Sequence, residues 1–248
     1  MPALRTETRS PNALVARAMH ARANLNADAR RTVDRVDNLD PFHAVGRTIA
    51  VAKGGIVFEE GDPAEAYFRV VSGSLRLYRM TEDGKRQIIA FLHSGQFFGL
   101  ELDDIHQFSV DALSSAVVQR LPRAQVTALI HRDSTLGDYL FAMLRDQLMS
   151  TQQRLVLERF SAKARVASFL VMLSRRNGKT GTARDIHLAM SRSDIADFLG
   201  LAVETISRAI GELKENAIIS LVNPQHIAIR KFEALQEIAK CEIDGAPA

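Results

Sequence analysis

The chain has 248 residues, enough for one or two domains with hydrophobic cores of their own, and we expect two. Hydrophobic residues make up 46% and charged residues 25%, which excludes a fully disordered, collagen-like or coiled-coil chain. The single cysteine, Cys241, excludes internal disulfides and any four-cysteine zinc or iron–sulfur site built by one chain.

The sequence carries no signal for membrane insertion or export. No apolar run approaches the roughly 20 residues of a membrane-spanning helix. The opening stretch MPALRTETRSPN lacks the apolar centre of a secretory signal. We therefore expect a cytoplasmic protein with no membrane partner.

The net charge of +3 is spread unevenly along the chain. Residues 160–232 carry a net charge of +5, whereas residues 48–159 carry −2. A basic excess confined to one segment favours a polyanionic partner such as nucleic acid. A solvated basic face is the alternative, and only the motifs within the segment can decide between the two.

The first half of the chain predicts a short extension followed by a β domain. Residues 1–47 read as a partly helical extension dotted with arginines. In residues 48–132, short runs rich in Val, Ile, Phe and Tyr are separated by Gly61, Gly73, Gly84 and Gly95. Turn signals at such regular spacing predict an antiparallel sandwich or barrel. Within it, residues 78–91 predict a hairpin that turns at Asp83-Gly84.

Residues 133–160 predict one long amphipathic helix. Its apolar residues recur at spacings of three, four and seven, and it is far longer than the average helix of about 11–12 residues. The apolar stripe could lie on the β domain, but the length favours a two-stranded seam and therefore a homodimer. The candidate seam residues are Leu136, Leu140, Met143, Leu144, Gln147 and Arg154.

Residues 161–235 contain two short helical patterns that break at Gly200, which is typical of a helix-turn-helix. The inner faces consist of apolar residues, namely Ile195, Ala196, Leu199, Leu201, Ile206, Ile210 and Leu213. Residues 217–222 and 226–230 then predict a hairpin that would form the wing of a winged helix. Residues 236–248 are expected to be a tail.

Three polar residues fall on the outer side of the second helix near its start. Glu204, Ser207 and Arg208 share this side because steps of three and four return to one face. In a helix-turn-helix this part of the second helix lies against base edges in the major groove. Arg suits guanine, Glu suits cytosine and Ser suits either edge. The alternative is a Glu204–Arg208 ion pair within the helix, worth only about 0.2–0.5 kcal/mol.

With these motifs in place, residues 45–235 resemble the Crp/Fnr family of bacterial transcription regulators. Residues 61–73, GDPAEAYFRVVSG, resemble the cyclic-nucleotide-type β-roll signature, and residues 201–208, LAVETISR, resemble the recognition helix. The resemblance implies an α+β fold. A cyclic-nucleotide-binding-like β-roll (jelly roll) would be followed by a long dimerisation helix and a C-terminal winged helix-turn-helix. It also implies a DNA-binding regulator, usually an activator, and not an enzyme.

The recognition helix is similar to the Fnr-type reader. Residues 204–208, ETISR, imply a palindrome like TTGAT-N4-ATCAA, read by Glu204, Ser207 and Arg208, with Val203 on a thymine methyl. The resemblance also implies phosphate contacts, which position the protein without reading sequence. These would come from Arg192, Ser193 and Thr205.

The sequence departs from the family pattern in three places, and these departures limit which ligands and which subgroup of the family we expect. His106-Gln107 stands where the family has the Arg-Ser or Arg-Thr pair that holds a cyclic phosphate, so we expect no cyclic AMP and no other cofactor. The N-terminal cysteine cluster of the iron–sulfur form is missing. Ala202 replaces the usual Ser or Thr cap of the recognition helix, a loss of roughly 1 kcal/mol. A regulator of this kind looks most like the FixK group, which controls microaerobic or nitrogen-fixation genes.

Two further expectations concern partners. The turn Thr81, Glu82, Asp83, Gly84 and Lys85 matches a loop with which relatives touch RNA polymerase, although a solvated hairpin tip is equally compatible. The second functional hypothesis is a regulatory protein whose β-roll binds a small effector or haem and controls a partner. For haem, the candidate ligands are His43, His93 and His106.

Overall fold

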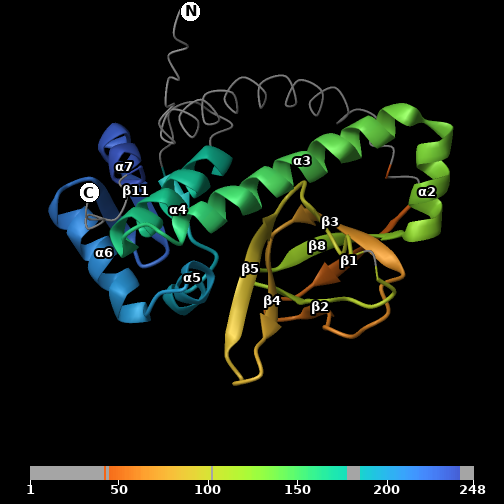
Figure 1. Cartoon of the computed structure of the whole chain (residues 1–248), viewed down its shortest axis with the longest axis horizontal. Coiled ribbons are helices and arrows are strands. Elements are labelled where there is room, and N and C mark those ends of the chain that lie inside the picture. Colours follow the sequence, from red (N-terminus) through yellow and green to blue (C-terminus); the bar gives the residue numbers. More distant parts are fainter. Residues whose placement is uncertain (1–41, 43–44, 102, 178–184, 241–248) are drawn as a thin grey trace, which may run out of the picture.

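A long helix, α3 (Ser134–Leu157), joins two folded units in the computed structural model of the chain (Figure 1). The structure describes residues 42, 45–101, 103–177 and 185–240. Residues 1–41 of the predicted extension, His43, the loop 178–184 and Cys241 therefore lie outside the described residues.

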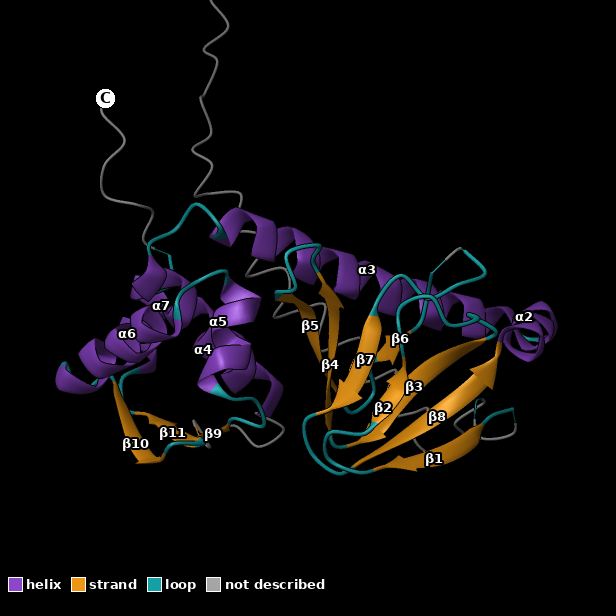
Figure 2. Ribbon diagram, turned by 90° about the horizontal axis from the view of Figure 1, so that it is seen from below, coloured by secondary structure: helices purple, strands orange, loops and turns teal. Residues whose placement is uncertain are grey.

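The first unit is a β-roll of two four-stranded antiparallel sheets, which Figure 2 shows beside each other below α3. One sheet has the strand order β1-β8-β3-β6 and the other β2-β7-β4-β5. The predicted antiparallel sandwich is therefore confirmed. The strands are β1 (Arg47–Val51), β2 (Ile56–Phe58), β3 (Ala66–Ser72), β4 (Ser74–Met80), β5 (Arg86–His93), β6 (Phe97–Phe98), β7 (Ser109–Ala112) and β8 (Ala116–Pro122).

Strand periodicity builds the β-roll core. Alternate residues of β3, namely Ala66, Phe68 and Val70, are buried because every second side chain lies on the same face. They meet inward residues of the opposite sheet, such as Leu75. The predicted β4–β5 hairpin is also confirmed, and its turn contains Gly84 at φ 75°, a conformation that glycine adopts without steric cost.

The helices after the β-roll cover its end and lead away from it. Helix α2 (Arg123–Arg132) precedes α3, and the two pack together near β8. Their shared core with the β-roll contains Phe42, Phe97, Leu121, Val126 and Leu136. The predicted long helix is confirmed. Of the helices in the described part of the chain, none combines the length and the hydropathy that a bilayer-spanning segment needs.

The second unit is a winged helix-turn-helix, as predicted from the sequence. A three-stranded sheet of order β10-β11-β9 forms the wing, so β9 adds a strand to the predicted hairpin. The elements are α4 (Ala162–Asn177), β9 (Asp185–His187), α5 (Arg192–Leu199), α6 (Val203–Glu215), β10 (Ile219–Asn223), β11 (His226–Ile229) and α7 (Phe232–Ile238).

Helix α7 corrects the expected start of the tail at residue 236. The helix continues to Ile238 because Leu235 and Ala239 are buried in the core of this unit. The hydroxyl of Ser168 in α4 also donates a hydrogen bond to the Ala239 carbonyl at 3.0 Å. The winged unit therefore extends to at least Ala239.

Candidate DNA interface and the surfaces that position it

Local capping signals define both ends of the first helix of the helix-turn-helix. Helix α5 begins with a capping box: the Ser191 hydroxyl accepts from the Asp194 amide at 3.1 Å, and the Ser191 amide donates to Asp194 Oδ2 at 2.9 Å. The helix ends at Gly200, whose φ of 64° lies in the left-handed region that favours glycine. The apolar residues predicted for the inner faces of α5 and α6, such as Ile195 and Ile206, are buried.

Helix α6 exposes the predicted reading residues. Glu204, Ser207 and Arg208 are exposed, whereas Ile206 and Ala209 on the opposite side are buried. The Ser207 hydroxyl donates to the Val203 carbonyl at 3.0 Å. Among the ion pairs of the described residues, none joins Glu204 to Arg208. Helix α6 starts without a side-chain cap at Ala202, as predicted.

The three predicted phosphate contacts differ in their surroundings. Ser193 is exposed and Thr205 is half-buried. Arg192 is half-buried, and its Nη2 donates to the Pro224 carbonyl at the tip of the wing, 3.3 Å away. Burial lowers the pKa of Arg192. The side chain therefore ties α5 to the wing, a contact that the sequence did not suggest.

The structure moves the candidate dimer seam to another side of α3. Leu136 is only 3% exposed and belongs to the core between α2, α3 and the β-roll, so a partner cannot reach it. Leu140 and Met143 pack against the same core. The prediction of Leu136 as a seam residue is therefore wrong, because the β-roll end covers its side of the helix. Leu140 and Met143 are half-buried, and their place in a seam stays a prediction.

A different apolar stripe on α3 remains exposed. Phe141 is 66% and Leu148 is 57% exposed. Leu144, the fourth predicted seam residue, lies on this stripe with Leu155. The spacings of three, four and seven are those of a heptad seam. Gln147 is also exposed. The side chain of Arg154 lies outside the described residues.

Aromatic rings pack around His106, which stands where the family has the arginine that holds a cyclic phosphate. The rings of His106 and Phe58 are stacked with their centroids 3.6 Å apart, and Phe68 and Phe98 pack on Phe58. His106 is 2% exposed, and its Nδ1 lies 3.3 Å from Glu101 Oε2. His106 therefore interacts with Glu101 of the same domain.

Of the two other histidines proposed for haem, the structure describes only His93. His93 Nδ1 lies 3.4 Å from the Ser74 hydroxyl at the end of the β4–β5 pair, and His43 lies outside the described residues. In the described residues there is also no cluster of three or more His, Cys, Asp or Glu side chains able to hold a metal.

The β4–β5 hairpin tip is a small, solvent-exposed polar structure. The Thr81 hydroxyl donates to the Lys85 carbonyl at 2.8 Å, and Lys85 Nζ pairs with Asp83 Oδ2 at 2.7 Å. Hydrogen bonds from Lys85 and Thr81 lower the pKa of Asp83 to about 2. The exposed tip therefore presents a charged pair in a defined turn.

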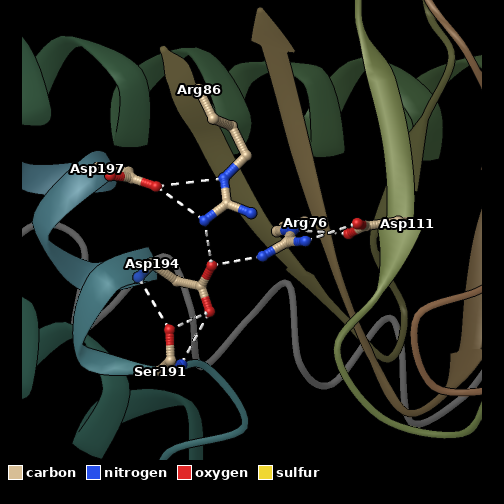
Figure 3. Close-up of polar contacts among 6 residues, drawn as sticks. All are labelled: Arg76, Arg86, Asp111, Ser191, Asp194 and Asp197. Atoms are coloured by element: carbon tan, nitrogen blue, oxygen red, sulfur yellow. Dashed lines mark hydrogen bonds and ion pairs between the residues drawn. The ribbon is translucent and has the colours of Figure 1, made fainter. Parts of the chain in front are cut away.

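An ion cluster joins the β-roll to α5, and the sequence did not reveal it (Figure 3). We use the name inter-domain ion cluster for Arg76, Arg86, Asp111, Asp194 and Asp197. Arg76 on β4 pairs with Asp111 on β7 and with Asp194 on α5. Arg86 on β5 pairs with Asp194 and Asp197 at 2.8 Å each. The motif Ser191-x-x-Asp194 could have predicted the capping box, but nothing local predicts the arginine partners.

The charges in this cluster hold one another in their ionised forms. Burial raises the pKa of Asp194, but hydrogen bonds from Ser191 and the charges of Arg76 and Arg86 outweigh it, so the net shift is downward. Burial likewise lowers the pKa of Arg76, and Asp111 and Asp194 more than offset it, so the net shift is upward. Asp194 and Arg76 are therefore both ionised near neutral pH.

Two family models match the chain, one in each unit. A cyclic nucleotide-binding domain matches residues 48–133, and a Crp-like helix-turn-helix domain matches residues 164–238. Together they span more than half of the chain.

Similar proteins match over most of the sequence. The chain is 37% identical to the nitrogen fixation regulation protein FixK of Azorhizobium caulinodans, covering 79% of this chain and 80% of the relative. It is 34% identical to FixK of Rhizobium meliloti, covering 86% and 97%. The solved structure of FixK2 from Bradyrhizobium japonicum has a TM-score of 0.72 and 32% identity, covering 82% of this chain and all of that one.

Proposed function

Because the chain belongs to the Crp/Fnr family of transcription regulators, we propose that it binds a TTGAT-N4-ATCAA palindrome as a homodimer. The genes under its control would serve microaerobic or nitrogen-fixing growth. The two relatives named as nitrogen fixation regulation proteins support this biological setting. Like them, the chain is a DNA-binding regulator and not an enzyme.

One observation carries the proposal: α6 presents a polar reading face that no other part of the described chain covers. Glu204, Ser207 and Arg208 are exposed side by side, held by an apolar inner face in the core of the winged unit. Arg208 would donate to guanine, Glu204 would accept from cytosine, and Ser207 would serve a neighbouring base. Val203, 38% exposed at the start of α6, would contact a thymine methyl.

Contacts to the DNA backbone would set the position of α6 in the groove. We assign them to Ser193, exposed at the start of α5, to Thr205 and to Arg192. Arg192 would also hold the wing through Pro224 while it neutralises a phosphate. Such contacts add affinity for any sequence and make binding depend on salt.

The exposed stripe of α3 supports a homodimer. Phe141, Leu144, Leu148 and Leu155 form a row of apolar side chains that face solvent in one protomer, and a row of this length marks an interaction surface. A second copy offers the same heptad row, so two α3 helices can close it by knobs-into-holes packing. A two-fold dimer also matches the two-fold symmetry of the proposed palindrome.

Contact with RNA polymerase would come from the β4–β5 hairpin tip. Thr81, Glu82, Asp83, Gly84 and Lys85 extend beyond the two sheets at the end of the longest hairpin (Figure 1). The exposed Lys85–Asp83 pair offers both signs of charge to a protein partner. Activation by recruitment is therefore part of the proposal.

A band-shift experiment tests the proposed function. The purified protein is titrated onto a duplex with TTGAT-N4-ATCAA and onto a matched duplex whose two guanines are replaced, at about 0.15 M salt. We expect the second duplex to bind more weakly than the first by about 1–3 kcal/mol for each replaced base pair. Equal affinity for both duplexes would contradict the proposed reading of the palindrome.

The second hypothesis, an effector-binding or haem-binding β-roll, gains no support from the described residues. Phe58, Phe68, Phe98 and His106 pack on one another inside the β-roll.

A further inference from the structure

We propose that Arg76 and Arg86 of the β-roll are positioning residues for operator reading. They hold α5 by Asp194 and Asp197, so that the two α6 helices of a dimer keep the separation that the operator spacing requires. This inference rests on the proposed function, because it assumes a dimer on a two-fold operator.

Asp194 uses its two carboxylate oxygens for two different sets of contacts (Figure 3). Oδ2 accepts from the Ser191 amide at 2.9 Å and from the Ser191 hydroxyl at 2.7 Å, and so closes the start of α5. Oδ1 accepts from Arg76 Nη1 and from Arg86 Nη2, the latter at 2.8 Å. One side chain therefore fixes the helix start and attaches it to two strands of the β-roll.

The side chains of Arg76 and Arg86 are themselves held by further hydrogen bonds to Asp111 and Asp197. Arg76 Nε and Nη2 donate to the two oxygens of Asp111 on the neighbouring strand, both at 2.7 Å. This bidentate geometry fixes the guanidinium plane. Arg86 uses Nε and Nη2 on Asp197 at 3.2 and 2.8 Å. The side chains of Asp194 and Arg76 are only 6% and 18% exposed, so water screens their attraction weakly.

An apolar contact between the β-roll and the winged unit lies beside the ion cluster. Phe91 on β5 lies with its ring centroid 5.0 Å from that of Phe198 on α5 and 6.0 Å from that of Phe169 on α4. A shift in the β4–β5 register between Leu77 and Tyr78 turns Ile88 outward into this same core. The apolar contact supplies adhesion, and the directional ion pairs define one orientation.

The short segment that connects α3 to the winged unit also helps to orient α6. Only residues 158–161 separate α3 from α4. Arg165 on α4 donates to the carbonyls of Glu158, Phe160 and Leu199, the last two at 3.0 and 3.2 Å, and so ties this connection to the end of α5. The orientation of α6 relative to α3 is therefore set jointly by this connection and by the ion cluster.

The docked arrangement leaves the DNA face free. Glu204, Ser207 and Arg208 stay exposed while α5 is held by the β-roll. Half-sites of a two-fold operator lie about 34 Å apart, so both α6 helices must keep a fixed distance to bind together. A loosened α5 would cost affinity for the correct spacing and would reduce the preference for that spacing.

The test uses charge reversal and a charge swap. The variants are Arg86→Glu, Asp197→Arg and the double variant that carries both changes. Arg79→Glu is the matched control, because Arg79 lies on β4 and pairs with Glu60 rather than with α5. Each full-length protein is titrated onto duplexes with TTGAT and ATCAA separated by four, five or six base pairs, and onto random DNA.

We expect each single variant to lose about tenfold in affinity for the four-base spacer, which is typical for a broken contact pair. We also expect each single variant to lose most of its preference for the four-base spacer over the five-base and six-base spacers. Affinity for random DNA should stay unchanged. The double variant should recover part of both properties, because the swap restores the pair between positions 86 and 197 but not the pair with Asp194. Arg79→Glu should behave as wild type. A variant that had only lost stability would bind all the duplexes more weakly, and the charge swap would not restore its affinity.

The outcomes separate this inference from the proposed function. If the wild-type protein ignores the palindrome, the proposed function is wrong. If the wild type prefers the four-base spacer and both single variants keep that preference and affinity, the positioning role alone is overturned. A double variant no better than Arg86→Glu would also overturn it. Spin labels at Lys53 and Glu215, in a Cys241→Ser background, give a readout without DNA when each labelled protein is mixed with an excess of its unlabelled form, so that a dimer carries one labelled protomer. We expect one narrow distance in wild type and in the double variant, and a broad one in the single variants.

Discussion

The imidazole of His106 lies flat on the ring of Phe58, with an angle of 10° between the rings and 3.6 Å between their centroids. This stack sits in the β-roll, where Phe68 and Phe98 close around it. In this protein the interior of the cyclic-nucleotide-type domain is therefore part of the hydrophobic core. The winged unit packs against this domain through Phe91 on β5, whose ring meets Phe169 and Phe198.

The filled interior predicts that cyclic AMP does not stabilise the protein. A ligand that binds only the folded state raises the melting temperature, and the rise grows with the ratio of the ligand concentration to Kd. We expect no change in melting temperature up to millimolar cyclic AMP, measured by differential scanning fluorimetry. A concentration-dependent rise would show that the aromatic core opens to admit the nucleotide.

His106 itself should contribute to stability. The variant His106→Ala removes a buried ring and leaves Glu101 without its partner, so we expect unfolding to cost about 2–4 kcal/mol less. Urea unfolding followed by circular dichroism measures this. Gln107→Ala is the control, because this half-buried neighbour bonds only to Asp103 in the described structure, and its effect should stay within about 0.5 kcal/mol.

Arg208 should read a base and not the backbone. The variant Arg208→Ala should lose about 1–3 kcal/mol per half-site and should no longer distinguish the guanine from other bases at its position. Band shifts on the palindrome and on guanine-substituted duplexes measure both effects. Arg192→Ala should instead weaken all duplexes and flatten the salt dependence by about one unit of slope. A uniform loss in Arg208→Ala would place that side chain on phosphate.

The exposed stripe of α3 should control dimer formation. The variant Leu148→Asp puts a charge in the seam, so we expect a folded monomer of 27.4 kDa by light scattering. Operator affinity should fall by about a hundredfold or more because the second half-site no longer binds in the same molecule. Met149→Asp, one position off the seam, makes the same change and should remain a dimer. Leu136→Asp should unfold the chain, since Leu136 lies in the core of the protomer.

The pKa of Asp194 predicts how acid affects stability. The groups that face Asp194 are Arg76 from β4 and Arg86 from β5, while Asp197 and Asp111 share these arginines. Because the pKa of Asp194 is lowered in the folded state, its charge stabilises the fold fully above the unfolded value of about 3.9. That contribution is lost as the pH falls through the folded pKa, since the unfolded chain binds the proton first.

The variant Asp194→Asn isolates this contribution. We expect wild type to melt at a higher temperature than Asp194→Asn at pH 6, and the difference to shrink as the pH is lowered below about 4. Thermal unfolding at a series of pH values measures it. A difference that stays constant down to the lowest pH would assign the effect to the size or hydrogen bonding of the side chain and not to its charge.

The sequence by itself determined the features that depend on neighbouring residues. Gly200 breaks the two helices because it adopts a left-handed conformation, and the period of Ile206 and Leu213 places the polar reading residues on the outer side of α6. The hairpin turn at Gly84 follows from the same local rules. These signals depend on backbone preferences and side-chain period, which a single segment carries.

Only the tertiary structure decided which surfaces are covered and which distant residues meet. Helix α3 carries two apolar rows with similar periods, and packing against the β-roll end buries Leu136 and leaves Leu148 exposed. Arg76 and Asp194 lie 118 residues apart in the chain, and no local pattern joins them. Their contact arises because the β-roll and the winged unit share an apolar core, which brings two charged side chains together at its edge.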